Sequence, residues 1–170
     1  AQTHLITDGG FDDAGEWTDG SSGTGTAVVS GSVLTLTGGT TGANLYQAGA
    51  VPDPDKVVGV AGDYYVVTLD VVSATSTVII RLGETSSSGP GSTTAAVGSN
   101  TLVIPHGGDN DDIQISTAGS QDAVVDNITV KLIPGNHAVA PSDAVRPLLT
   151  TTALDGASGN GVDIDLFAPG

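Results

Sequence analysis

The chain has 170 residues, which is the length of one domain with an appendage. Its 19 acidic residues outnumber four basic ones, and the net charge of −15 disfavours nucleic acid and anionic membranes as partners because both would be repelled. Cysteine is absent, which excludes a disulfide framework and a thiolate metal site, and no apolar run reaches the roughly 18 residues that span a membrane.

The N-terminal stretch combines a short apolar run with a glycine turn and acidic residues. A strand at residues 5–6 is expected to run into an Asp-Gly-Gly turn at residues 8–10. Phe11 and the carboxylates of Asp12 and Asp13 follow the turn. Trp17 lies in a polar, glycine-rich loop, and we expect its ring in the core because a lone Trp more often packs than binds.

A β-hairpin is predicted next. The apolar runs 27–30 and 33–37 flank the two-residue connection Gly31-Ser32, and a connection that begins with glycine is typical of a type II′ turn. Leu34 and Leu36 alternate with threonines, so both are expected to face the core.

The middle of the chain holds further short runs with strand alternation. The longest covers residues 64–72, where Asp70 is expected to face outward and four apolar residues inward: Tyr65, Val67, Leu69 and Val71. Shorter runs lie at 43–48, 77–82, 93–97, 101–104 and 112–116. With no convincing helix and eight or nine short strands, the sequence predicts an all-β antiparallel sandwich.

The last strand is predicted over residues 123–132 and carries an acidic residue among its apolar ones. Four apolar residues share one face by parity: Val124, Ile128, Val130 and Leu132. Asp126 has the same parity and is therefore expected to point toward the core. A buried carboxylate must be paired, hydrogen-bonded or bound to a metal ion.

The segment from residue 134 onward has a different texture. Its prolines favour an extended chain, and the alternation at residues 162–166 suits a strand added to a neighbouring chain. Its apolar side chains have no core of their own and are expected to form an assembly arm: Leu148, Leu149, Leu154, Ile164, Leu166 and Phe167. A disordered end is the alternative.

Two motifs resemble those of a known family. Ile-Thr-Asp-Gly-Gly-Phe-Asp at residues 6–12, with Trp six residues after the Phe, and Val-Asp-Asn-Ile-Thr-Val at residues 125–130 resemble the galactose-binding-like jelly roll. This is the sandwich of family-4/22-type carbohydrate-binding modules, and it is similar to domains of bacteriophage tail and virion-surface proteins. The resemblance implies a jelly-roll β-sandwich over residues 1–133. The composition of residues 134–170 predicts that an extended C-terminal arm for assembly contacts follows it.

The resemblance also implies a structural calcium ion (Ca2+). In that family the ion ties a Gly-Gly-Phe-Glu turn to an Asp of the last strand. Asp12 stands in the place of the Glu, and Asp126 matches the strand Asp. Asp12 is one carbon shorter than Glu, so Asp8 or Asp13 could replace it among the six to eight oxygen ligands that calcium favours.

The sequence offers no convincing catalytic constellation. It has no Cys nucleophile, no Gly-x-Ser-x-Gly elbow and no phosphate-binding Gly-x-x-x-x-Gly-Lys. His4, His106 and His137 lack the spacing of zinc ligands, and the carboxylates are better explained as a solvated acidic face. We therefore expect a protein that is not an enzyme.

Three functions remain open. The principal interpretation is a structural protein of a bacteriophage virion, a capsid decoration or a tail or fibre surface component, that assembles with itself as a homo-oligomer and with other virion proteins. The alternative is a carbohydrate-binding module of a secreted bacterial protein, with host-surface glycans as ligands. Sugar binding requires exposed aromatic faces. With Phe11 and Trp17 expected in the core, four aromatic residues remain: Tyr46, Tyr64, Tyr65 and Phe167. Of these, Tyr65 has core parity. A fragment of a bacterial adhesin or surface-layer protein is the third.

Overall fold

The computed structural model describes residues 5–51 and 63–133, and this part of the chain is all-β. Two five-stranded antiparallel sheets contain ten strands, and one short 3-10 helix, η1 (Ala14–Glu16), precedes them. The strands are β1 (Thr18–Asp19), β2 (Thr26–Val29), β3 (Leu34–Thr37), β4 (Asn44–Gln47), β5 (Tyr64–Ala74), β6 (Val78–Leu82), β7 (Ser92–Ala95), β8 (Gly98–Pro105), β9 (Ile113–Ser116) and β10 (Ala123–Leu132). The predicted assembly arm lies outside the described residues.

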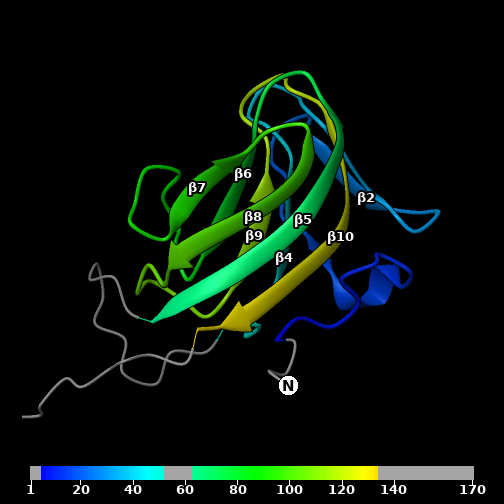
Figure 1. Cartoon of the computed structure of the whole chain (residues 1–170). Helices are drawn as coiled ribbons and strands as arrows, with labels where there is room; N and C mark the ends of the chain where they lie inside the picture. The colour runs from blue at the N-terminus through cyan, green and yellow to red at the C-terminus, as the bar shows by residue number, and fades with distance from the viewer. Residues whose placement is uncertain (1–4, 52–62, 134–170) are drawn as a thin grey trace, which may run out of the picture. The chain divides into compact units, whose positions relative to one another are not determined.

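The sheets have the orders β1-β4-β9-β6-β7 and β2-β3-β10-β5-β8, here called sheet A and sheet B. Figure 1 shows β8, β5 and β10 side by side, with β6, β9 and β4 behind them. The prediction of an antiparallel β-sandwich is confirmed. None of the described residues belongs to a helix that is long and apolar enough to cross a membrane.

The core lies between the sheets and is built by strand alternation. On β5 the four residues predicted to face inward are each at most 2% exposed, while Asp70 points outward. Leu34 and Leu36 of β3 are fully buried, as predicted. Their sheet-A counterparts on β6 and β9 are aliphatic as well: Val78, Ile80, Leu82, Ile113 and Ile115.

The predicted hairpin forms, but its turn is of another type. Ser30 N donates to Val33 O at 3.1 Å, and β2 pairs with β3. Gly31 and Ser32 both have positive φ, at +64° and +59°, which is the pattern of a type I′ turn rather than the predicted II′. The I′ turn matches the right-handed twist of the flanking strands.

The predicted inward orientation of Asp126 is wrong because β10 contains a β-bulge. Asp126 pairs with Asp70 and Thr129 with Thr68, so two residues of β10 oppose the single Leu69 of β5. Asn127 takes a φ of +52° at this point. The extra residue reverses the parity, so the fully buried side chains of β10 are 123, 125, 128 and 130, while Asp126 lies on the outer face.

The N-terminal segment docks beside β10 without forming the strand predicted at residues 5–6. Leu5 N donates to Val130 O at 3.1 Å, and Ile128 N donates to Gly9 O at 2.8 Å. Gln47 fixes the same segment from sheet A: its buried side chain accepts from Thr7 N and donates to Thr7 O, both at 2.9 Å. Two hydrogen bonds at separate points hold the segment against the sheet in place of regular strand pairing.

Phe11 and Trp17 close one end of the core, as predicted for Trp17. They are 1% and 6% exposed, and their ring centroids lie 5.2 Å apart. Trp17 Nε1 donates to Asp8 O at 3.0 Å, which satisfies the indole N–H inside the protein. Asp8 and Phe11 both have positive φ, near +55°, a conformation that is uncommon for residues other than glycine.

A Gly9→Ala substitution should destabilise the fold because the N-terminal segment passes very close to β10. A Cβ at Gly9 would overlap the backbone carbonyl of Ile128, and moving the segment away would break the hydrogen bond from Ile128 N to Gly9 O. We expect a loss of about 2 kcal/mol or more in the free energy of unfolding, measured by denaturant titration.

Gly10→Ala is the matched control, since its Cβ would meet only Asp12 Oδ2 at 3.5 Å. Equal stabilities of the two variants would show that the segment does not pack against Ile128 in solution.

Candidate functional site

The four aspartates predicted to bind calcium each accept hydrogen bonds from nearby protein groups. The Asp8 carboxylate accepts from the backbone N–H groups of Asp12 at 2.8 Å and Asp13 at 2.9 Å. Asp12 accepts from Ser32 Oγ at 2.6 Å, Asp13 from Gly15 N at 2.8 Å, and Asp126 from Asn127 N at 2.7 Å.

This arrangement does not fit a calcium cage. Within residues 5–51 and 63–133, no group of three or more acidic or histidine side chains is placed to hold a metal ion. An inward Asp126 would need a compensating cation, but the bulge places Asp126 on the outer face. Calcium binding therefore stays a prediction from the resemblance.

Asp126 lies opposite another carboxylate on the outer face of sheet B. It pairs with Asp70, and Asn127 Nδ2 donates to both carboxylates, at 3.0 Å to Asp70 and 3.3 Å to Asp126. Hydrogen bonds from Ser99 and then from Asn127 lower the pKa of Asp70 below its ordinary value. Like charges placed opposite each other repel, and the bridging amide offsets that repulsion.

Elsewhere on this outer face, Thr68 Oγ1 and Thr129 Oγ1 lie 2.7 Å apart and share a hydrogen bond. Its most exposed apolar side chains are Val103 at 59%, Val72 at 58%, Val28 at 51% and Tyr64 at 48%. Tyr64 lies opposite Pro105 at one end of β5, away from the two carboxylates.

The outer face of sheet A has a different chemistry. The register places one row of outward residues straight across all five strands: Thr18, Tyr46, Gln114, Arg81 and Ser92. A second row lies beside it on four of these strands: Asn44, Ser116, Ile79 and Thr94. With strands about 4.8 Å apart, the first row is roughly 19 Å long. We call these two rows the Tyr46 face.

Gly20 gives the Tyr46 ring its place at this face. Gly20 N donates to Asn44 O at 2.9 Å, which sets the glycine beside the strand. A Cβ at Gly20 would come within 2.8 Å of Asn44 Nδ2 and 3.0 Å of Tyr46 Cδ1. Tyr46 is half-buried, so part of its ring remains open to solvent.

The guanidinium of Arg81 is a fixed positive charge within the Tyr46 face. Its Nη1 donates to Thr85 O and its Nη2 to Ser116 Oγ, both at 2.9 Å. Burial lowers the pKa of Arg81 below its ordinary value, and the Glu84 carboxylate acts in the opposite direction. The guanidinium still carries its charge at neutral pH.

Two buried polar atoms of the Tyr46 face have no protein partner. Asn44 Oδ1 and Arg81 Nε are inaccessible to solvent, and no described group bonds either atom. Leaving a buried polar group unsatisfied costs roughly 1–3 kcal/mol, so such atoms call for an explanation. Both atoms lie beside Ser116 but are covered by protein, so a ligand could reach them only if neighbouring side chains moved.

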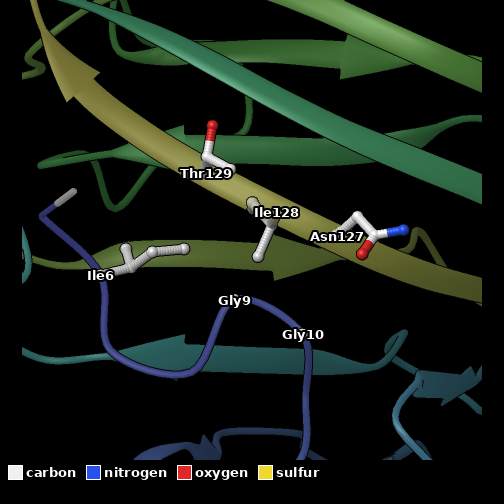
Figure 2. A pocket seen from close by; sticks show the side chains of 6 residues that line it. All are labelled: Ile6, Gly9, Gly10, Asn127, Ile128 and Thr129. Carbon is white, nitrogen blue, oxygen red and sulfur yellow. The ribbon is translucent and has the colours of Figure 1, made fainter.

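Two hollows in the described part are poorer candidates. One of about 240 Å³ lies between the N-terminal turn and β10, where Figure 2 shows Asn127 and Thr129 diverging from the strand. It contains no aromatic or charged side chain and is smaller than the roughly 300 Å³ at which ligand pockets begin. Another, of about 320 Å³, lies at the far end of β10 and is lined by Thr35, Leu36, Thr37, Ser73, Ala74, Thr75, Asp122, Ala123 and Val124.

The Tyr46 face was not predicted, although its residues alternate visibly. Asn44 and Tyr46 alternate with buried Leu45 and Gln47, and polar residues alternate with Ile113 and Ile115 on β9. The pattern predicts outward side chains on each strand. It does not show which strands are neighbours, and the row exists only through the pairing of β4, β9 and β6.

Comparisons with known proteins find similarity in backbone structure. No protein-family model matches the chain, and no curated protein matches it. A family-4 carbohydrate-binding module is similar over 72% of this chain and 98% of its own, with 15% identity and a TM-score of 0.48. A mutant of a family-29 carbohydrate-binding module is similar over 78% and 91%, with 12% identity and a TM-score of 0.47.

The enzymatically active domain of tailspike protein 4 from bacteriophage CBA120 is also similar. The match covers 76% of this chain and 21% of that one, with 19% identity and a TM-score of 0.46. The solved structures similar to this chain thus include jelly-roll carbohydrate-binding modules, and at these identities the likeness concerns the fold alone.

The role of Asp126 can be tested with an isosteric change. Asp126→Asn keeps the oxygen that accepts from Asn127 N and removes the charge opposite Asp70. If Asp126 holds no ion, we expect a melting temperature equal to or above that of the wild type, measured by calorimetry at neutral pH with and without EDTA. A melting temperature that EDTA lowers in the wild type but not in the variant would instead establish a calcium site that includes Asp126.

Proposed function

We propose that this chain is a non-enzymatic binding module that takes a carbohydrate chain across the Tyr46 face. The observation that carries the proposal is the row of Tyr46, Gln114 and Arg81 across three paired strands.

The chemistry of the row suits a sugar chain. A sugar ring has apolar C–H faces and a rim of hydroxyl groups, each of which both donates and accepts hydrogen bonds. The partly exposed ring of Tyr46 can stack on such a face. Gln114 offers both a donor and an acceptor, and Arg81 offers donors only, so neighbouring hydroxyls can be bound along the row.

The shape of the site favours an extended ligand and modest affinity. The row is open and about 19 Å long, so it can contact several linked sugar rings but enclose none of them. A single aromatic contact and partly solvated hydrogen bonds leave little surplus over the cost of association. We therefore expect dissociation constants roughly in the micromolar to millimolar range.

The setting of the module is a separate proposal, carried by the sequence alone. A bacteriophage virion surface suits its cysteine-free, strongly acidic chain and its apolar C-terminal segment. A secreted bacterial protein is the alternative setting. Peptides of this chain in purified phage particles from its source would support the virion, and their confinement to culture supernatant without particles would exclude it.

Tyr46→Ala should abolish glycan binding while the protein stays folded. The substitution removes the only aromatic ring of the row and leaves the backbone pairing of β4 intact. A panel of soluble polysaccharides in affinity electrophoresis would find the ligand, and titration calorimetry would measure the loss, which we expect to be at least tenfold.

Tyr64→Ala is the matched control, because Tyr64 is 48% exposed on sheet B, away from the proposed site. Loss of binding in the Tyr64 variant with retention in the Tyr46 variant would overturn the assignment.

A further inference from the structure

Sheet B has a free edge at β8. The strand order of this sheet ends at β8, and the eight residues of β8 pair with β5 from Tyr64↔Pro105 to Val71↔Gly98. No described strand pairs with its other side. The remaining sheet edges are β1, β2 and β7, with two, four and four residues, so β8 is the longest open edge in the described part.

The pairing shows which backbone groups of β8 are open. Tyr64 O accepts from Ile133 N, so the polar backbone groups of Tyr64 face away from β8. In an antiparallel ladder such residues alternate with hydrogen-bonded ones. The residues of β8 opposite 64, 66, 68 and 70 therefore direct their backbone groups to the free edge. These residues are Pro105, Val103, Thr101 and Ser99.

This edge lacks the features that prevent an edge strand from pairing with another chain. Natural edge strands are guarded by charged residues, internal proline, bulges or short length. β8 reads Gly-Ser-Asn-Thr-Leu-Val-Ile-Pro, without a charged residue and with proline only at its end. Its register with β5 is unbroken, and the outward side chain of Val103 is 59% exposed.

Charge narrows the choice of partner. With a net charge of −15, two copies of this chain repel each other over most of their surfaces. The outward residues of β8, together with the neighbouring Val66 and Thr68 on β5, form an uncharged strip, and Asp70 opposite Ser99 is the only charged residue of β5 along it. A second copy can approach this strip without placing like charges directly opposite each other.

We propose that β8 pairs with β8 of a second copy, antiparallel about a two-fold axis, and joins the two B sheets into one. The open backbone groups restrict the register to pairs among residues 99, 101, 103 and 105. We place Thr101 opposite Thr101 of the other copy, with Ser99 opposite Val103 on both sides, because this register forms three complete pairs without Pro105, which has no N–H. Each of these three pairs exchanges two backbone hydrogen bonds, and every side chain brought face to face is uncharged.

The absence of native cysteine makes a direct test possible. Residues of a hydrogen-bonded antiparallel pair have Cα atoms about 5.5 Å apart, within the range that a disulfide spans. Thr101→Cys in the full-length chain should therefore form a disulfide-linked dimer on mild oxidation. Val72→Cys is the control, because Val72, like Thr101, is exposed, but it lies on β5 away from the edge.

Sedimentation velocity of variants without cysteine provides the second readout. Thr101→Asp places two carboxylates opposite each other at the axis and should weaken the dimer at least tenfold, whereas Val72→Asp adds the same charge off the edge and should leave it intact. Equal cross-linking of the two cysteine variants, a monomeric wild type, or a dimer unaffected by Thr101→Asp would each overturn the proposal. In the last case the contact lies elsewhere, for example in the C-terminal segment.

Discussion

The bulge at Asn127 is the constraint on which this end of the sandwich depends. It shifts β10 by one residue, so that Ile128 and Val130 enter the core after Asp126 has turned outward. The same shift lets Ile128 N bind Gly9 O, which fixes the N-terminal turn. This N-terminal turn then positions Phe11 and Trp17 over the end of the core. A single left-handed residue thus connects sheet pairing, chain entry and core closure.

The two sheets share the same inner construction but differ on their outer faces. On sheet B, polar groups satisfy one another, as in the Thr68–Thr129 bond and the Asn127 bridge between two carboxylates. On sheet A, the Tyr46 face brings an aromatic ring, an amide and a cation into one row along paired strands. An aromatic ring beside polar groups of both kinds suits a sugar ring, which has apolar faces and a rim of hydroxyl groups. This is why we propose the glycan site on sheet A.

Local features of the fold could be predicted from the sequence, because they depend on alternation within one strand. The inward residues of β5 and the hairpin at Gly31 are of this kind. The orientation of Asp126 could not, since a bulge changes parity without leaving a clear mark in the sequence. The predicted calcium ligands depended on that orientation and on the resemblance to a known family. The Tyr46 face depends on the pairing of strands that are separated by tens of residues, which periodicity does not report.

A glycan that binds across the strands of sheet A must contact the Tyr46 face. This can be measured by titrating the 15N-labelled protein with an oligosaccharide that it binds and following the amide chemical shifts in NMR spectra. We predict that the largest shifts fall on Tyr46, Gln114 and Arg81, which form the row across β4, β9 and β6. Shifts confined to β5, β8 and β10, with sheet A unchanged, would contradict the account.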